Sequence, residues 1–381
     1  MNILCFGEPL IRFATVAHER LDEARTMEIS YSGAESVVAV TLAQFGEQVS
    51  FASKLSSNRL GTNAIMNLAR YGVDTSRITR SNHRMGLYYT ERGRSIRPTV
   101  VTYDRSDTAM ANATREDFDW DHMLNGVEVF FFSGVVPAIS DEVYRASLDG
   151  LKACKGRGIK VVMDLNYRET MWTRDDALKK VHKLLRYVDV LVASEDDVIT
   201  IEKAKVGERE VFDFCLGWAR GLMMDYPLSK VCFVVRQIDR YDVARIRGGM
   251  ITREDTYLSL PQHVSLADIS SCGSVFAAAL IHGFSSKWEP QFVIDFATMT
   301  SAFKATVSGD LSFASETEIA SLLAVGVKPS IRQSSTEVAL RPGPSRPSRL
   351  LSPRRKGRAC GSRWREGREG PYGNVAVSTT V

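Results

Sequence analysis

The sequence predicts a three-layer α/β/α fold with a mainly parallel central sheet and a small β lid. Two observations support this prediction. Short apolar runs alternate along the chain with amphipathic stretches of helical length, which is typical of parallel strands covered by helices on both faces. Two further stretches have a β-like pattern with no helix between them, and this pattern suits a small second sheet that projects from the main one.

The apolar runs are far shorter than the roughly 20 residues that cross a bilayer, so we interpret them as buried strands. The first run opens the chain. It has neither the basic residues nor the long apolar core of a signal peptide. In chain order, the expected strands are residues 3–6, 127–132, 160–164, 188–193 and 231–235.

Between these runs, apolar residues recur at the spacing of one helix face. The β-like stretches that interrupt this order, residues 10–15 and 86–103, are expected to form the lid. No linker or internal repeat divides residues 1–327, which we interpret as one domain. The expected helices are residues 36–45, 62–71, 141–155, 176–186, 210–224, 275–284 and 291–307.

Residues 328–381 have a different composition from the rest of the chain. They hold six of the twelve prolines, 12 of the 49 Lys and Arg residues and 3 of the 45 Asp and Glu residues, a net charge of +9 against −5 for residues 1–327. Such a segment cannot bury enough apolar surface to offset chain entropy, so we expect a disordered basic tail rich in Pro, Arg, Gly and Ser. Two origins stay open: a basic arm for acidic partners, or out-of-frame translation of the end of the gene.

Composition also narrows the class of protein. A hydrophobic content of 44% and a charged content of 25% are ordinary for a globular protein. The six cysteines form no C-x-x-C pair and the six histidines lack zinc-ligand spacing, so we expect reduced thiols, a cytoplasmic location and no zinc site. Residues 1–327 are acidic and would repel a phosphate backbone, which argues against nucleic-acid binding.

The most informative local pattern is a polar turn at residues 268–274, followed directly by an apolar helix. A helix start of this kind presents backbone N–H groups and the positive end of the helix dipole to an anion. We therefore expect the backbone N–H groups of Ser271, Cys272, Gly273 and Ser274 to form an anion hole.

Six segments, in order along residues 1–327, resemble those of the ribokinase-like carbohydrate kinases, the PfkB family. Within that family the set looks most like the kinases of 2-keto-3-deoxygluconate. Four segments resemble longer family motifs: residues 31–39 (G-G-A-x-x-N-V-A), 164–172 (D-x-N-Y-R-x-x-x-W), 268–274 (D-x-x-G-x-G-D) and 302–310 (A-L-K-H-x-x-P-G-D). The other two are residues 86–89 with 97–105, and residues 132–134.

The resemblance implies a ribokinase-like fold and a site for a sugar acid. A sugar acid carries a carboxylate and several hydroxyls, which arginine forks and neutral hydrogen-bonding groups can recognise. By the resemblance, Arg105 and Arg168 are the candidate carboxylate clamps. Gly33 and Tyr89 would line the sugar site, and Asn166 either contacts the ligand or caps a turn.

The resemblance also implies ATP and Mg²⁺ as cofactors, but the residues that would serve them depart from the family pattern. The family's catalytic aspartate, which takes the proton from the acceptor hydroxyl, is replaced by Ser274. Ser271 and Cys272 replace small residues and would each add a Cβ near the phosphate. Asp268 is retained and either lies near the phosphates or caps the start of the helix. Ser194 and Asp197 stand where the family organises phosphate and magnesium, which makes Asp197 a candidate metal ligand. Residues 236–240 replace a glycine-rich turn that in the family usually neighbours the nucleotide.

Two functions follow from this uneven match. The first is an ATP-dependent kinase for 2-keto-3-deoxygluconate or a related sugar acid, slowed because Ser274 is too weak a base. The second is a catalytically inactive pseudokinase that binds the sugar acid as a sensor or partner subunit. The family resemblance further implies a possible homodimer that forms through the lid, whose exposed strands need a partner.

Overall fold

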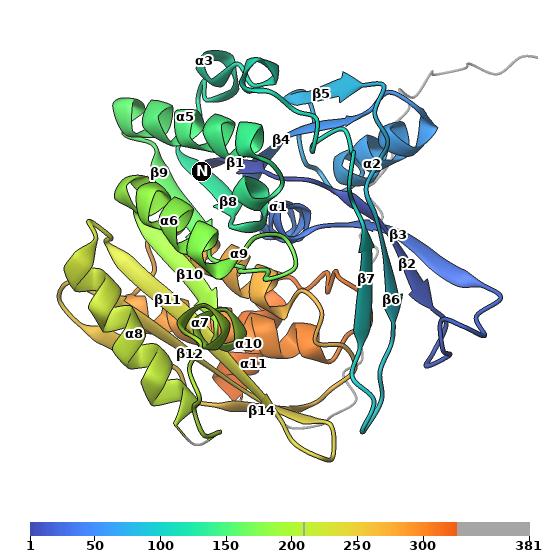
Figure 1. Cartoon of the computed structure of the whole chain (residues 1–381). Helices are drawn as coiled ribbons and strands as arrows, with labels where there is room; N and C mark the ends of the chain where they lie inside the picture. Colours follow the sequence, from blue (N-terminus) through green and yellow to red (C-terminus); the bar gives the residue numbers. More distant parts are fainter. Residues whose placement is uncertain (209, 326–381) are drawn as a thin grey trace, which may run out of the picture. The chain divides into compact units, whose positions relative to one another are not determined.

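The computed structural model describes residues 1–208 and 210–325 (Figure 1). Its main sheet has the strand order β13-β12-β11-β10-β9-β8-β1-β4-β5, and β14 pairs with β12 beside β13. Strands β11, β10, β9, β8, β1, β4 and β5 run parallel to one another. At the β11 end of the sheet, β12 pairs antiparallel with β11, and β13 and β14 pair antiparallel with β12. The bounds of the strands in the main sheet are β1 (Asn2–Phe6), β4 (Gln48–Ser56), β5 (Ile78–Ser81), β8 (Val129–Ser133), β9 (Lys160–Asp164), β10 (Val190–Ser194), β11 (Lys230–Ile238), β12 (Val243–Thr252), β13 (Thr256–Leu258) and β14 (Gln262–Ser265).

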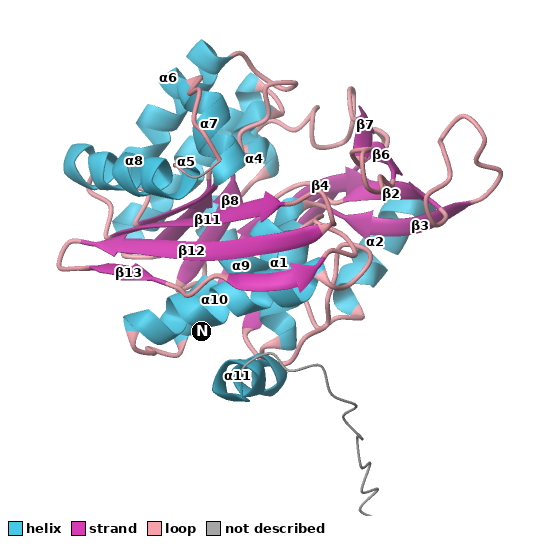
Figure 2. Ribbon diagram, turned by 90° about the horizontal axis from the view of Figure 1, so that it is seen from below, coloured by secondary structure: helices cyan, strands magenta, loops and turns pink. Residues whose placement is uncertain are grey.

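Helices cover both faces of this sheet, as Figure 2 shows. Strand β1 illustrates why, because its residues alternate between two cores: Leu4 and Phe6 belong to one, Ile3 and Cys5 to the other. The first core includes α3 (Trp120–Met123), α5 (Asp141–Arg157), α6 (Arg174–Leu184), α7 (Glu195–Glu202) and α8 (Val211–Asp225), with α4 (Val135–Ala138) at its edge. The second includes α1 (Ala34–Gln44), α2 (Arg59–Ala69), α9 (Cys272–Ser285), α10 (Pro290–Ala305) and α11 (Glu316–Val325).

A second, four-stranded sheet has the order β3-β2-β6-β7 and extends to one side of the main sheet (Figure 1). Its strands are β2 (Leu10–Thr15), β3 (Met27–Ser32), β6 (Leu87–Glu91) and β7 (Val100–Asp104). The β2–β3 and β6–β7 pairs are antiparallel and the β2–β6 pair is parallel. We call this sheet the lid. It holds both stretches that the sequence assigned to a lid, together with β3, which the sequence pattern did not indicate.

The predicted α/β/α fold class is confirmed, and each expected strand and helix of the main layers has a counterpart. Strands β4 and β12 were missed because polar residues or glycines interrupt their apolar pattern. The two glycines of β12 are required by packing: a Cβ on Gly249 would lie 2.4 Å from the ring of Phe233, and one on Gly248 would lie 2.5 Å from Thr298 Oγ1. No helix in the described ranges is long and apolar enough to cross a membrane. The expected basic tail lies outside the described residues.

Candidate active site

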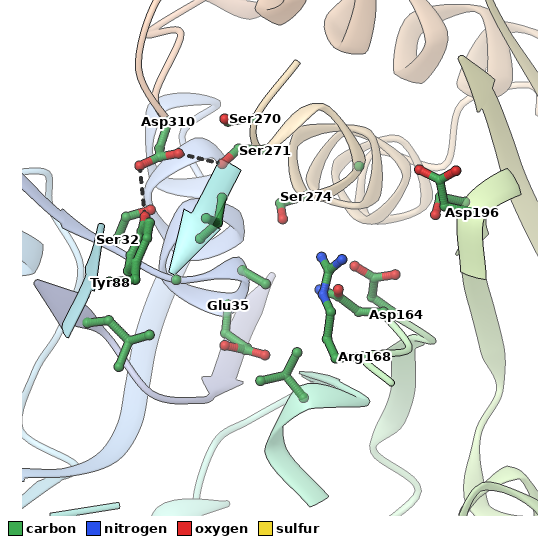
Figure 3. A pocket seen from close by; sticks show the side chains of 18 of the residues that line it. Ser32, Glu35, Tyr88, Asp164, Arg168, Asp196, Ser270, Ser271, Ser274 and Asp310 are labelled. Atoms are coloured by element: carbon green, nitrogen blue, oxygen red, sulfur yellow. Dashed lines mark hydrogen bonds between the residues drawn. The ribbon is translucent and has the colours of Figure 1, made fainter. Parts of the chain in front are cut away.

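A cavity of about 370 Å³ opens at the carboxyl ends of the parallel strands, between the main sheet and the lid. In open α/β sheets this edge is where ligands bind. The cavity walls come from the ends of β1, β9, β10 and β11, from the lid strands β2, β6 and β7, and from the starts of α1 and α9 (Figure 3). Nine of the residues singled out in the sequence line it: Gly33, Arg105, Asn166, Arg168, Ser194, Asp197, Ser271, Gly273 and Ser274.

On the lid side, Arg105 forms an ion pair with Glu8, which is 5% exposed. The second oxygen of the Glu8 carboxylate accepts a 2.6 Å hydrogen bond from Thr108 Oγ1. The sequence indicated Arg105 but not Glu8. Glu8 lies two residues after the end of β1, directly after Gly7. The charge of Arg105 is therefore already compensated, and the pair presents both donors and acceptors to a polyhydroxylated ligand.

A second buried network joins the lid to the loops on the other side of the cavity. Arg12 of β2 is 2% exposed and contacts Asp310 at 2.9 Å and Asp268 at 3.8 Å. Asp310 also accepts hydrogen bonds from Tyr88 Oη at 3.2 Å and from Ser271 Oγ at 3.1 Å (Figure 3). Burial and the charge of Asp310 raise the pKa of the Tyr88 hydroxyl. The signal for Arg12 was present in the sequence as a lone arginine in an otherwise apolar strand.

The prediction for Tyr89 is corrected by the structure. Tyr88 lines the cavity, whereas Tyr89 points to the other face of the lid and stacks on Phe13, with ring centroids 5.4 Å apart. Successive residues of a strand face opposite sides, so only one of two adjacent tyrosines can reach the ligand. The motif located the strand but did not fix which of its faces is turned to the cavity.

The start of α1 forms another part of the wall. A Cβ at Gly33 would lie 2.7 Å from the backbone oxygen of Glu8, so the close approach of the two segments requires glycine there. Glu35, two residues later, is buried and accepts a hydrogen bond from Ser133. Burial raises the pKa of Glu35, although the bond from Ser133 opposes that effect. Sequence reasoning did not select Glu35.

Beyond the end of β9, Asp164, Asn166 and Arg168 line the cavity. Asn166 adopts a left-handed backbone conformation with φ of 36°. Burial, with the charge of Asp197, raises the pKa of Asp164 well above the usual range of an aspartate, which favours its protonated form. Within the part of the chain that the structure describes, Arg168 has no ion-pair partner. Its side chain extends beside Asp164 towards the turn that carries Ser274 (Figure 3).

The turn before α9 keeps the main-chain features of an anion site. Gly273 and Ser274 donate their backbone N–H groups to no acceptor in residues 1–208 and 210–325. A Cβ placed on Gly273 would meet nothing within 4 Å, so the space beside these donors is open. Ser271 caps the helix with a left-handed φ of 61°, a conformation that favours glycine.

Ser274 and Cys272 differ in where their side chains lie. Ser274 lines the cavity, is 7% exposed, and its hydroxyl makes no hydrogen bond to any residue that the structure describes. Cys272 belongs to the second core, which includes α1, α9 and α10, and burial raises the pKa of its thiol to about 11. The expectation that the Cβ of Cys272 crowds the phosphate is therefore wrong, although its backbone still belongs to the turn.

Asp268 serves the protein's own loops and does not line the cavity. Its carboxylate accepts hydrogen bonds from the backbone N–H groups of Ser270 at 2.9 Å and Gly309 at 3.0 Å. Burial would raise the pKa of Asp268, but the charge of Lys304 and these bonds lower it. Lys304 is fully buried and donates to the backbone oxygens of Asp268 at 3.3 Å and Val307 at 3.0 Å. The predicted contact of Asp268 with a nucleotide is corrected to a role in holding two loops together.

Asp197 lines the cavity, yet both of its oxygens are already used. One accepts the backbone N–H of Tyr167 at 2.7 Å, and the other accepts the N–H and hydroxyl of Ser194 in a helix cap. Among the described residues no group of three or more His, Cys, Asp or Glu side chains is arranged to hold a metal ion. Both oxygens of Asp197 thus accept hydrogen bonds within the protein, Ser194 serves as its capping partner, and the role of Asp197 as a magnesium ligand stays a prediction.

Arg236, at the end of β11, occupies the same end of the cavity. Its backbone N–H and Nε donate to Glu195 at 3.0 and 3.3 Å. Burial raises the pKa of Glu195 to about 7 even though Arg236 opposes the shift. This buried pair stands in the region where the resemblance places a glycine-rich turn.

Comparisons with known proteins agree with this architecture. The model of the pfkB family of carbohydrate kinases matches residues 1–213. The 2-dehydro-3-deoxygalactonokinase of Haloferax volcanii is 29% identical over 325 residues, which cover 85% of this chain and 97% of the relative. The 5-dehydro-2-deoxygluconokinase of Clostridium perfringens is 26% identical over 311 residues, covering 79% of this chain and 86% of the relative.

A solved structure extends the likeness to the backbone. The crystal structure of 2-dehydro-3-deoxygluconokinase from Thermotoga maritima is 33% identical in sequence and has a TM-score of 0.81, with coverage of 85% of this chain and 99% of that chain.

Proposed function

The chain belongs to the pfkB family of carbohydrate kinases, and on that premise we propose that it is a slow kinase for a sugar acid. The proposed acceptor is 2-keto-3-deoxygluconate or a related acid, and the proposed donor is ATP with Mg²⁺. The observation that carries the proposal is a cavity with a polar, prearranged sugar side and an open helix start, which has a serine where the family has its base.

Each part of the cavity has a proposed task. Glu8 with Arg105 accepts hydrogen bonds from the sugar hydroxyls and donates hydrogen bonds to them, and Gly33 lets the Glu8 segment pack closely against the start of α1. Arg168 binds an anionic group of the ligand. The backbone N–H groups of Gly273 and Ser274 bind the transferred phosphate at the helix start. When bound, Mg²⁺ supplies charge neutralisation on the phosphates of ATP, and Asp197 is not assigned to it.

The proposed rate limit is proton removal from the acceptor hydroxyl. A serine hydroxyl cannot hold that proton near neutral pH, and the absence of a positioned base typically costs about 10²- to 10⁴-fold. Some turnover remains because a loose phosphoryl-transfer transition state tolerates late loss of the proton. The slow rate and the retained pocket are thus compatible in one molecule.

The test is to restore the carboxylate. We expect Ser274→Asp to raise kcat with 2-keto-3-deoxygluconate and Mg²⁺-ATP by about 100-fold or more. Ser274→Asn is the matched control, because it has the same size without the basic oxygen. If Ser274→Asp and Ser274→Asn are equally slow, the missing base is not what limits turnover.

A second function is favoured by the nucleotide end of the cavity. The oxygens of Asp197 are engaged, and the Arg236–Glu195 pair stands where the resemblance places a glycine-rich turn. A pseudokinase that binds the sugar acid without ATP fits those features. Melting temperature separates the two functions: a kinase is stabilised by both the acid and Mg²⁺-ATP, while the pseudokinase responds to the acid alone.

We also propose that two copies pair through their lids, in a cytoplasmic protein. Strands β3 and β7 are the edges of the lid, and Ile29 and Val100 are 64% and 50% exposed there. The cytoplasmic location is supported by five buried free cysteines in the described residues. In sedimentation velocity, the protein is expected to run as a dimer and Ile29→Asp as a monomer; a monomeric wild type contradicts the pairing.

A further inference from the structure

We propose that the tightest-binding occupant of this cavity is the phosphomonoester of the sugar acid, with its phosphate against Ser274 at the start of α9. This inference rests on the proposed function, because the sugar part of the ligand is the same. It differs in the form of the ligand: the phosphorylated acid is held more tightly than the free acid, whether or not the protein produces it.

The first observation is a set of donors that no part of the described protein uses. The Gly273 and Ser274 N–H groups point out of the first turn of α9 without acceptors, and the space beside Gly273 is open. The Ser274 hydroxyl is an independent feature, because the residue is only 7% exposed and lines the cavity, and the hydroxyl has no hydrogen-bond partner among the described residues. A phosphate oxygen accepts from all three donors at one place.

The second observation is the sign of the charge around this place. A carboxylate at position 274 would stand against a bound phosphomonoester, whose charge near neutral pH is about −1.5 to −2. Ser274 removes that repulsion and supplies a donor instead. Arg168, which has no ion pair with any described residue, extends towards the same turn (Figure 3).

The acidic groups nearby do not cancel this preference. Asp310 is engaged by Arg12, Tyr88 and Ser271, and Asp268 is paired with backbone N–H groups beside the buried Lys304. Burial raises the pKa of Asp164, next to Arg168, and this favours the neutral form of that carboxyl group. The polar pair Glu8–Arg105 remains available to the hydroxyls at the other end of the ligand.

The consequence depends only on binding. In a slow kinase, the phosphorylated product dissociates slowly and competes with the γ-phosphate of ATP for the same hydrogen-bond donors. In a pseudokinase, the protein reports the phosphorylated acid and not its precursor. Both cases follow from the same substitution of a carboxylate by a hydroxyl.

Isothermal titration calorimetry of the full chain tests the inference with three probes: 2-keto-3-deoxygluconate, its 6-phosphate and inorganic phosphate. We expect the wild type to bind the phosphomonoester at least about tenfold more tightly than the free acid, the gain of one good charge-assisted hydrogen bond. Ser274→Asp is expected to weaken binding of the phosphomonoester by about 100-fold through close like-charge repulsion. Any loss of affinity for the free acid in this variant should be much smaller than the loss for the phosphomonoester, because the acceptor hydroxyl carries no charge.

Ser274→Asn is the control, since it matches the size of aspartate without its charge. It should keep most of the preference for the phosphomonoester, and circular dichroism establishes that each variant is folded. Equal affinity of the wild type for the two acids overturns the inference while leaving the proposed function standing. So does an equal loss for both acids in Ser274→Asp. Binding of neither acid contradicts both proposals, and binding of inorganic phosphate alone shows an anion site without a sugar subsite.

Discussion

The lid-facing wall of the cavity differs from the wall built from the turn before α9 and the ends of β10 and β11, which we call the nucleotide-facing wall, in how many polar groups are already paired. On the lid side, charged groups are buried and paired before any ligand arrives, as in Glu8–Arg105 and Arg12–Asp310. On the nucleotide side, Arg236 and Glu195 form a comparable buried pair, but the backbone N–H groups of Gly273 and Ser274 have no acceptor among the described residues. The comparison teaches that a helix start keeps its anion-binding N–H groups whatever side chains it carries, because those groups belong to the backbone.

The strongest way to break the comparison is to remove the charge that joins the two walls. Arg12→Met is expected to lower the free energy of unfolding by about 3–5 kcal/mol, because it leaves the buried carboxylate of Asp310 without its cation, whereas Asp268 keeps the nearby charge of Lys304. Urea unfolding monitored by circular dichroism measures the loss. Arg84→Met is the matched control, because Arg84 pairs with a solvent-exposed Asp104 and its removal should cost far less than that of Arg12.

An equal, small cost for both arginine variants would show that the lid is not fastened through Arg12. The lid-facing wall would then be no more prearranged than the nucleotide-facing one, and the contrast between the walls would reduce to the identity of residue 274.

The second prediction concerns Asp164, whose burial raises its pKa from 3.8 to about 8. The folded state holds this proton more tightly than the unfolded chain, so its contribution to stability is present below pH 4 and is lost as pH rises towards 8. Asp164→Asn keeps the shape and cannot ionise. Its free energy of unfolding relative to wild type should therefore rise across that range, by roughly 1 kcal/mol per pH unit and a few kcal/mol in total.

Urea unfolding at several pH values between 4 and 9 measures this difference. Glu195 titrates in the same range, with a pKa raised to about 7 by burial, and is present in both proteins, so its contribution cancels in the comparison. A constant difference between wild type and Asp164→Asn would mean that Asp164 is already ionised in the folded protein, and the electrostatic support for a phosphate beside Arg168 would weaken.

Sequence reasoning located the walls better than it assigned their side chains. The alternation of apolar runs and helical stretches predicted the parallel sheet, since strands buried on both faces need apolar residues at nearly every position. Motif positions brought Gly33, Arg105 and Arg168 to the cavity because their segments follow strand ends or open helices. Glu8 was missed because its function depends on Arg105, which is 97 residues away in the sequence.

The assignments for which the structure shows another role share a physical reason. Asp268 and Asp197 are carboxylates at motif positions, but local N–H groups take up their oxygens, and a sequence does not record how many hydrogen bonds an oxygen already accepts. Tyr89 failed because a shift of one residue along a strand reverses its face. Only coordinates show which face of a strand a residue occupies and which hydrogen bonds a carboxylate already accepts. The order of the layers, in contrast, follows from the sequence pattern alone.

The smallest expected effect concerns Ser271, where two variants distinguish the cost of the backbone conformation from the contribution of the side-chain hydrogen bond. Its left-handed φ of 61° disfavours any residue with a Cβ, while its hydroxyl donates to Asp310 at 3.1 Å. Ser271→Ala loses the bond and keeps the strain, so it should cost about 1–2 kcal/mol in the free energy of unfolding. Ser271→Gly loses the same bond but relieves the strain, and it should be more stable than Ser271→Ala by about 1 kcal/mol. Urea unfolding of the two variants measures the difference. If the alanine variant is as stable as the glycine variant, the left-handed conformation at residue 271 costs no measurable free energy, and the backbone of this turn is not strained by its serine.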